Sequence, residues 1–441
     1  MRALAVSIWI FVNLVFFGMC GYMYLLWSQY WMFMDRQTGT STSTYDQQIY
    51  FYNRGYLPNS SICYSVNVPE VKSRKKHSAV IIKENATFTV VKNSKPRFPN
   101  LQPKDFELDS ERFSCLKNDS YRECDKKTSE FKENILKELR KVFTDESNIL
   151  RTGKENPYNV NYRGSRGNFM EKSPKELLCL LKETSLKTLR RSDVGNHPLR
   201  DFIPKRALFE NKRFNSCAII ASAGSLKNSN LGSFIDSHDL VMRFNNAPTK
   251  GFEVDVGRKT TIRLLNSQVV TKPQFNFLTS TMYKNVTLVM WDPSNYTSFI
   301  SDWLDHPEFN LFMNYMAFRK NDQKSRAFLM NPQTIWNVWD FLQDNSPSRL
   351  RRNPPSSGFL GLKLLLPFCN FVDVVEYVPS VRVTRRCHYY DPEDNPSCTF
   401  GVWHPLAAEK LLTFFINYAS DNEVFQKGYV RIAGFKNMDC S

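Results

Sequence analysis

The chain has 441 residues, 42% of them hydrophobic and 14% aromatic, which is enough for one large domain or two ordinary ones with appendages. Its formal charge of +16, from 59 basic and 43 acidic residues, suits a nucleic acid, an anionic membrane or an anionic substrate. No C-x-x-C spacing occurs, which argues against a zinc ribbon.

The N-terminus predicts the compartment. No charged residue occurs from Ala3 to Met34, a stretch longer than the about 20 residues that span a bilayer. The apolar region of a cleavable signal peptide is only about 7–15 residues long. We therefore predict an uncleaved signal anchor over residues 4–34, with residues 1–3 cytoplasmic because Arg2 lies on the short side, and with the rest of the chain lumenal. A buried core helix is the alternative.

Residues 35–128 are polar and basic, with a Ser/Thr-rich run and the charge run KSRKKHS, and predict a lumenal stem. Five sequons support a secretory-pathway glycoprotein, at Asn59, Asn85, Asn118, Asn285 and Asn295. The lumenal address and the lack of nucleic-acid motifs assign the positive charge to an anionic substrate or to the stem. Apolar spacing over residues 129–143 predicts a helix, capped by Ser129, at the approach to a single catalytic domain over residues 129–441.

From about residue 156 onward, short apolar runs alternate with helical patterns. Strands are predicted at residues 216–220, 239–245, 259–265, 285–291 and 371–378, and helices at residues 231–239, 358–368 and 405–419. This alternation predicts an α/β fold with a mainly parallel sheet. Ligands of such sheets bind beyond the carboxyl ends of the strands, where ASAGS, RFNNAP, LLNSQ and WDPS fall.

Three motifs have candidate chemistry. ASAGSLKNSNLG follows a strand but lacks both the P-loop ending and G-x-G-x-x-G, so a structural turn also explains it. In NPPSSG, Ser356 and Ser357 begin a helix, where they either cap it or bind a phosphate or carboxylate. His404, just before Pro405 at another helix start, suits a neutral general base, although a surface or capping histidine is the plainer reading. No D-x-D occurs, so a sugar-nucleotide transferase of this sequence would stabilise its leaving group with protein donors.

Together these stretches resemble the animal sialyltransferases. CAIIASAGSLKNSNLGSFIDSHDLVMRFNNAPTKGFEVDVGRKTTIRLLNSQ is similar to their large sialylmotif, NPPSSGFLGLKLLLPFC to the small one, HYYD to the third and HPLAAEK to the very small one. AGSLK, RFNNAP, WDPS and the SCT-G--HPL--EK pattern are most similar to the β-galactoside α-2,6-sialyltransferases. The resemblance covers residues 179–440 and implies a Rossmann-like variant of the GT-A type, with helices on both faces of the sheet.

The resemblance also implies the reaction. Members transfer sialic acid from CMP-sialic acid to a glycan hydroxyl, with inversion and without a metal or other cofactor. His404 matches the catalytic base, which takes the proton from the acceptor 6-hydroxyl. The implied donor-binding residues are Ser222, Asn245, Asn266, Ser356, Ser357, Gly358 and Thr399.

The implied acceptor-binding residues are Gln268, Glu308, Trp403 and Lys410. Here the sequence departs from the family pattern, since Glu308 stands in place of Asp and Trp403 in place of Tyr. His388 also replaces the first Tyr of the third motif. The resemblance implies terminal galactose (Galβ1-4GlcNAc) on N-glycans as the acceptor. The longer carboxylate and the larger ring next to the sugar favour the alternative, N-acetylgalactosamine (GalNAcβ1-4GlcNAc).

The ten cysteines suit an oxidising compartment, and an odd nine remain once Cys20 is placed in the anchor. The resemblance implies the pairs Cys179–Cys440, Cys217–Cys369 and Cys387–Cys398. Cys115 and Cys124 are candidates for a short loop, which leaves Cys63 for a disulfide between two copies of the chain.

Three functions follow from the sequence. The first is a Golgi type II α-2,6-sialyltransferase of N-glycans. The second is an enzyme of the same family with another acceptor or linkage. The third is a lumenal glycan-binding homologue without catalysis, which the presence of His404, both serines and both asparagines disfavours.

Overall fold

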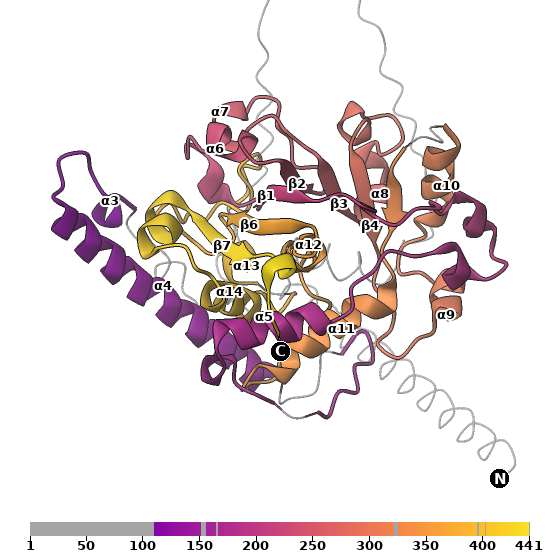
Figure 1. Ribbon diagram of the computed structural model, residues 1–441, viewed down its shortest axis with the longest axis horizontal. Coiled ribbons are helices and arrows are strands. Elements are labelled where there is room, and N and C mark those ends of the chain that lie inside the picture. Colours follow the sequence, from indigo (N-terminus) through magenta and orange to yellow (C-terminus); the bar gives the residue numbers. More distant parts are fainter. Residues whose placement is uncertain are drawn as a thin grey trace, which may run out of the picture. The chain divides into compact units, whose positions relative to one another are not determined.

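The computed structural model describes residues 110–150, 156–164, 166–321, 325–394, 397–401 and 403–440, which lie in one compact unit, Pro103–Ser441 (Figure 1). The predicted anchor, most of the predicted stem, and Cys20, Cys63, Asn59 and Asn85 lie outside these residues. Within the described ranges, no helix is both long enough and apolar enough to cross a membrane.

A seven-stranded sheet forms the centre of the unit, in the order β5-β4-β3-β2-β1-β6-β7. All neighbouring strands are parallel except β7, which runs antiparallel to β6. The strands are β1 (Phe214–Ile220), β2 (Leu240–Phe244), β3 (Ile262–Asn266), β4 (Thr287–Trp291), β5 (Ala327–Leu329), β6 (Cys369–Val375) and β7 (Tyr429–Ala433). The five predicted strands are confirmed, whereas the two outermost strands, β5 and β7, were not predicted.

The helices are α3 (Ser110–Phe113), α4 (Tyr121–Leu150), α5 (Pro174–Glu183), α6 (Gly232–Asp236), α7 (Glu253–Val256), α8 (Ser267–Thr271), α9 (Ile300–Asp305), α10 (Phe312–Asn321), α11 (Pro332–Asp344), α12 (Ser357–Leu365), α13 (Ser397–Phe400) and α14 (Leu406–Phe415). Each of the three helices predicted after residue 156 corresponds to one of these, namely α6, α12 and α14.

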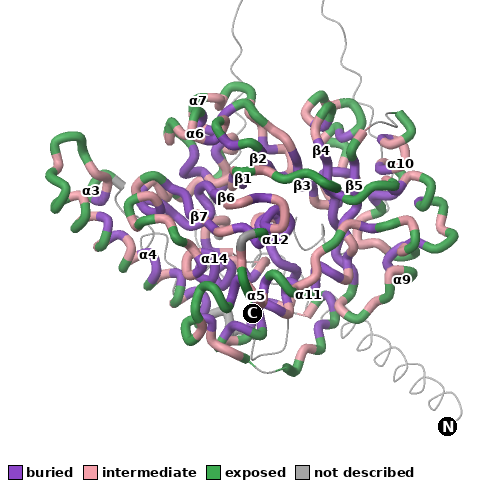
Figure 2. The backbone as a smooth tube through the Cα atoms, in the orientation of Figure 1, coloured by how far each residue is buried: buried purple, intermediate pink, exposed green. Residues whose placement is uncertain are grey.

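Helices cover both faces of the sheet, as strand alternation along β2 shows. Met242 and Phe244 lie against Gly361 of α12, where an added Cβ would stand 2.7 Å from the Met242 sulfur. Val241, whose side chain points to the opposite face from that of Met242, belongs to the buried cluster that includes Ile235 of α6 and Val256 of α7. The predicted α/β class with a mainly parallel, doubly covered sheet is therefore confirmed, and Figure 2 shows its strands buried between the helical layers.

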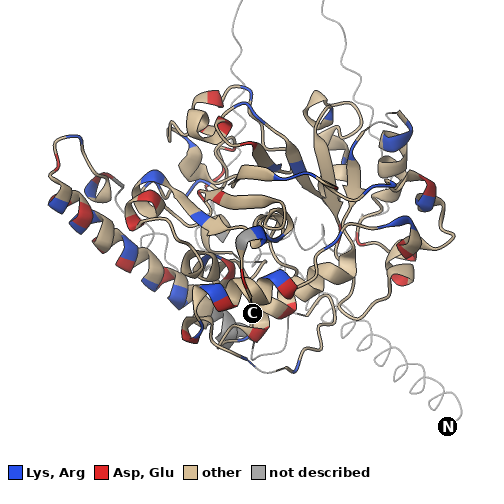
Figure 3. Cartoon of the chain, in the orientation of Figure 1, with Lys and Arg blue, Asp and Glu red and all other residues tan. Residues whose placement is uncertain are grey.

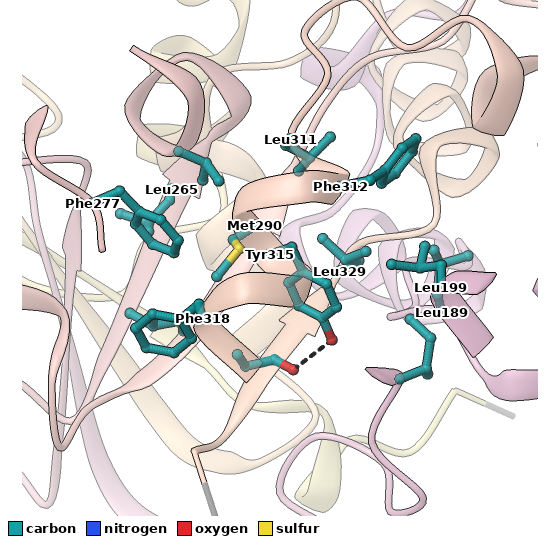
Figure 4. Close-up of a cluster of buried hydrophobic side chains, with 14 of the residues drawn as sticks. Leu189, Leu199, Leu265, Phe277, Met290, Leu311, Phe312, Tyr315, Phe318 and Leu329 are labelled. Carbon is teal, nitrogen blue, oxygen red and sulfur yellow. Dashed lines mark hydrogen bonds between the residues drawn. The ribbon is translucent and has the colours of Figure 1, made fainter. Parts of the chain in front are cut away.

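A second buried cluster lies under β3, β4 and β5 and is closed by α8, α9 and α10 (Figure 4). Tyr315 of α10 is buried in this cluster, and its hydroxyl donates to the Ala327 carbonyl at 3.0 Å (dashed line in Figure 4). The cluster anchors the half of the sheet that ends in the WDPS loop.

The predicted helix at residues 129–143 is part of the longer α4, which begins at Tyr121. Its buried stripe, including Phe131, Ile135 and Leu139, packs against α14 and the short helix η8 (Asn422–Lys427). Basic and acidic side chains alternate along the rest of α4 (Figure 3). Residues before 129 also contact the C-terminal part of the unit, since Gln426 forms hydrogen bonds with the backbone of both Phe113 and Cys115.

Four disulfides tie the unit together. Cys217–Cys369 joins the adjacent strands β1 and β6, Cys179–Cys440 joins α5 to the C-terminal segment, and Cys387–Cys398 closes the loop before α13. Cys115–Cys124 closes the loop before α4. The three pairs implied by the resemblance and the short loop pair are all confirmed.

Candidate active site

Most of the predicted site residues lie at the carboxyl edge of the sheet. Strand β1 lies between β2 and β6, so the connections on its two sides diverge at this point, which is the topological switch point of the sheet. The loops after β1, β2, β3 and β4 end here. Helix α12 runs back into β6, so its N-terminus is at the same edge.

Asn245 and Asn266 lie side by side after β2 and β3. Asn245 has a left-handed backbone (φ 46°), and its side-chain oxygen accepts from the Asn266 N–H at 3.1 Å. The side-chain oxygen of Asn266 caps α8 by accepting from Val269 N–H at 3.1 Å. Buried Arg263 fixes this turn by donating to the Asn245 carbonyl at 2.8 Å. With both oxygens used, the two side-chain NH2 groups are the donors available to a ligand.

The third motif lies against the loop after β1. The Ser222 carbonyl accepts from Tyr389 N–H at 3.2 Å, and the Ser222 hydroxyl bonds to Tyr390, whose pKa burial raises. His388 stacks on Tyr390 with ring centroids 5.1 Å apart, and burial lowers its pKa below 6.5. The replacement of Tyr by His388 in the third motif therefore changes the ring that packs on Tyr390, next to the loop after β1.

The two serines of NPPSSG have different roles in the structure. Ser356 is the N-cap of α12, accepting from Phe359 N–H at 3.2 Å, while its own hydroxyl donates to Glu409. Ser357 Oγ instead accepts from Trp291 Nε1–H at 3.1 Å, so its hydroxyl proton is free to donate. The groups that suit an anion are thus the Ser357 hydroxyl and the first backbone N–H groups of α12, including that of Gly358.

His404 has a defined tautomer. Its Nδ1 lies 2.8 Å from the Pro354 carbonyl, which can only accept, so Nδ1 bears the proton and Nε2 holds a lone pair. Burial lowers the pKa of His404 to about 4, which keeps the imidazole neutral. Because Pro354 lies two residues before Ser356, the same bond ties the histidine to the N-terminus of α12.

An aromatic and acidic wall adjoins His404. The Trp403 ring lies 4.4 Å from the His404 ring and 6.2 Å from the Tyr158 ring, centroid to centroid. Tyr158 donates its hydroxyl to Glu308 at 2.7 Å. The structure therefore brings two predicted acceptor residues, Glu308 and Trp403, together with His404 through Tyr158.

The acidic part of this wall is a pair of carboxyl groups, those of buried Asp292 and half-buried Glu308. Asp292, fully buried after β4, accepts from Trp303 Nε1–H at 2.9 Å and from the Glu308 backbone N–H at 3.0 Å. Burial raises the pKa of Asp292 to about 7. Burial first, and the charge of Asp292 second, raise the pKa of Glu308 to about 8.

Three predicted residues are placed differently. Lys410 is buried and donates to the Thr399 carbonyl, and no contact in the described part of the chain joins it to Glu308. Burial lowers its pKa to about 7. Thr399 thus contributes a backbone oxygen to this bond, and Gln268 lies half-buried in α8, where its carbonyl accepts from the Lys272 N–H at 2.9 Å.

Four residues of this edge were not predicted: Tyr158 and Asp292 of the wall, Glu376, which accepts from the Ser225 hydroxyl, and Tyr377, which donates to Glu409. Asp292 and the last two directly follow β4 and β6, so their places at the ends of predicted strands were the available signal. Tyr158 belongs to an irregular segment far from the motifs, and only the fold brings it to Glu308. Among the described residues, no group of three or more His, Cys, Asp or Glu side chains could hold a metal ion.

The fold and this edge define an α/β protein with a ligand site at the topological switch point. The profile of glycosyltransferase family 29 (sialyltransferase) matches residues 180–416, which include every one of these groups except Tyr158. The chain therefore belongs to glycosyltransferase family 29, the sialyltransferase family.

The chain is also similar to individual sialyltransferases. Beta-galactoside alpha-2,6-sialyltransferase 2 of Bos taurus is 40% identical over 291 residues, covering 65% of this chain and 58% of the bovine protein. The Xenopus tropicalis protein of the same name is 41% identical over 292 residues, covering 65% of this chain and 56% of its own length. The chain thus spans little more than half the length of these relatives. A solved mammalian sialyltransferase in complex with Gal-beta-1-3GalNAc-ortho-nitrophenol is 20% identical, with a TM-score of 0.36 over 61% of this chain and 90% of that one.

Proposed function

We propose that the protein transfers sialic acid from CMP-sialic acid to the 6-hydroxyl of a terminal galactose (Galβ1-4GlcNAc) on N-glycans, with inversion and with His404 as general base. The observation that supports this most directly is the hydrogen bond from His404 Nδ1 to the Pro354 carbonyl. It presents a neutral imidazole with a free Nε2, at a site where family membership supplies an acceptor hydroxyl to deprotonate.

The donor would bind between the loops after β1, β2 and β3 and the N-terminus of α12. The NH2 groups of Asn245 and Asn266 suit the hydroxyl and carbonyl oxygens of a nucleoside. The Ser357 hydroxyl and the α12 backbone N–H groups suit the phosphate or carboxylate, where the helix dipole adds to the attraction. The same donors would stabilise the charge that develops on CMP as it leaves.

His404 would act once the donor is bound. An anion next to the ring favours the imidazolium and therefore raises the pKa from its low value in the free protein. The base would thus be neutral before binding and stronger in the complex. The proton of the 6-hydroxyl would move to Nε2 as the oxygen attacks C2 of sialic acid, and the Pro354 carbonyl would hold the imidazolium through Nδ1–H.

The acceptor would lie against Tyr158, Trp403 and Glu308. A second acceptor, terminal N-acetylgalactosamine (GalNAcβ1-4GlcNAc), is favoured by one observation: burial raises the pKa of Glu308 to about 8, so the Glu308 carboxyl is mostly protonated at neutral pH. An uncharged carboxyl can donate to an amide carbonyl as well as accept from a hydroxyl. A Golgi type II anchor over residues 4–34, glycans at the exposed Asn118, Asn285 and Asn295, and a Cys63-linked dimer are further parts of the proposal.

The test is transfer by the full chain expressed in the secretory pathway. CMP-sialic acid is offered with Galβ1-4GlcNAc and GalNAcβ1-4GlcNAc termini in parallel, and product linkage is determined. We expect α-2,6 transfer to galactose that falls about 10²–10⁴-fold in His404→Asn. His306→Asn, a change at the C-cap of α9, is the matched control and should retain activity. Absence of transfer to either acceptor by a folded protein that binds CMP would favour the glycan-binding alternative.

A further inference from the structure

The two segments of the proposed donor site come from distant parts of the chain. The loop after β1 contains Ser222 and Ser225, and the N-terminus of α12 contains Ser356 and Ser357. Their separation must be fixed for one ligand to contact both. Strand β6 pairs with β1 and is fed by α12, so the residues that follow β6 are the ones positioned to reach both segments.

Glu376, the first residue after β6, is bonded to the β1 loop. Its side chain is 3% exposed, and Oε2 accepts from the Ser225 hydroxyl at 2.7 Å. Oε1 accepts from the Ser380 hydroxyl at 2.9 Å and pairs with Arg382. Its backbone is left-handed (φ 52°), and its N–H donates to the Gly428 carbonyl at 2.7 Å. A left-handed glutamate is strained, and such strain gathers at functional positions.

Tyr377, the next residue, is bonded to α12. Its hydroxyl donates to Glu409 Oε2 at 2.6 Å and lies 3.2 Å from Ser356 Oγ. Glu409 in turn accepts from the Ser356 backbone N–H at 2.8 Å. The Tyr377 ring packs on Gly358, where an added Cβ would meet it at 2.6 Å. The Tyr377 hydroxyl therefore fixes Ser356, the N-cap of α12, and the Tyr377 ring packs on the first turn of that helix.

We propose that Glu376 and Tyr377 are a pair of positioning residues that fix the β1 loop and the N-terminus of α12 at the separation the donor requires. The pair acts through Ser225 on one side and through Ser356 and Glu409 on the other, and neither member touches the ligand. The left-handed turn at Glu376 lets two consecutive side chains reach two different segments. This inference rests on the proposed function, because it assumes that CMP bridges the two segments.

The test uses Tyr377→Phe, which keeps the ring against Gly358 and removes the hydroxyl. Losing one of the hydrogen bonds that hold Glu409 predicts about tenfold weaker CMP binding by the full chain, measured by calorimetry. The KM for the glycan acceptor should stay within about twofold. Ser225→Ala, which removes the bond to Glu376, should weaken CMP binding in the same direction.

Two further variants separate positioning from a general loss of stability. Tyr315→Phe removes another buried tyrosine hydroxyl, in the cluster under β4, and should lower the thermal midpoint while CMP binding stays within about twofold. In a Ser356→Ala background, Tyr377→Phe should have a smaller effect than in the parent, because the group through which it acts is already gone.

The outcomes distinguish the two proposals. A parent protein that binds no CMP refutes the proposed function itself. A parent that binds CMP, with Tyr377→Phe and Ser225→Ala binding as tightly, overturns the positioning pair alone. So would an equal rise in donor and acceptor KM, or full additivity of the Tyr377 and Ser356 changes.

Discussion

Replacing Glu308 by glutamine should stabilise the fold at neutral and basic pH and leave it unchanged in acid. Burial raises the pKa of Glu308 from 4.5 to about 8, so the folded state retains a proton that the unfolded state releases. The folded protein is therefore favoured below pH 4.5, and this contribution is lost as the pH rises towards 8. Glutamine keeps the shape and still accepts from Tyr158, but it does not ionise.

The size of the effect follows from the same values. Each pH unit above 4.5 removes about 1.4 kcal/mol until the folded carboxyl itself titrates, which gives about 3 kcal/mol at pH 7. Asp292, with a pKa raised to about 7, titrates over part of the same range. The stability of Glu308→Gln relative to the parent should thus rise steadily between pH 5 and pH 8.

The assay is urea unfolding at pH 5, 6, 7 and 8, with disulfides intact and with slopes compared as well as midpoints. Glu133→Gln, at an exposed position of α4, is the control and should leave the pH dependence unchanged. Parallel pH profiles for the parent and Glu308→Gln would refute the reasoning, because they would show that Glu308 ionises in the folded protein as readily as in the unfolded one.

Three more predictions follow from the structure. The midpoint of the acid limb of kcat/KM, measured with saturating acceptor, should lie below pH 6.5, since burial lowers the pKa of His404. A midpoint at or above pH 6.5 would contradict the neutral base. Replacing both Cys217 and Cys369 by alanine should cost about 3–5 kcal/mol of unfolding free energy, because the disulfide closes a separation of 152 residues; denaturant unfolding with only a few tenths lost would argue against it. Gly434→Ala should lower the thermal midpoint by several degrees, because its Cβ would lie 1.7 Å from the Cys369 carbonyl, and an unchanged midpoint would contradict that contact.

The central strands were predictable because their apolar runs are long and each is followed by a polar loop. β2, β3 and β4 are buried at nearly every position, and Leu, Ile, Val and Met fill most of these positions; β1 and β6 each end in a buried, mostly apolar run. β5 has only three residues and β7 contains Arg431, whose guanidinium pairs with buried Asp373 at 2.7 Å. A strand of three residues is too short to show a period, and Arg431 at the centre of β7 divides its apolar residues into two pairs, so neither sequence has an apolar run that identifies a strand. The tertiary pair that makes Arg431 acceptable there is invisible along the chain.

For the site, residue type was predictable and partner was not. His404, Asn245 and Ser357 lie at the predicted edge with side-chain groups left for a ligand. Lys410 also lies near that edge, yet it donates to the Thr399 carbonyl. Whether a polar side chain at this edge faces a ligand or bonds within the protein depends on the residues packed around it, and the sequence does not show these neighbours.

The two adjacent serines show how a cap and an anion site can share one helix start. A cap must accept from the backbone, and Ser356 does so while giving its proton to Glu409. An anion needs a hydroxyl that donates, and Ser357 is prepared for this because Trp291 N–H occupies its acceptor side. Glu409 therefore makes Ser356 a structural residue, and Trp291 makes Ser357 a donor. Exchanging the partner of either serine, rather than the serine itself, is what would reverse their roles, since both carry the same hydroxyl.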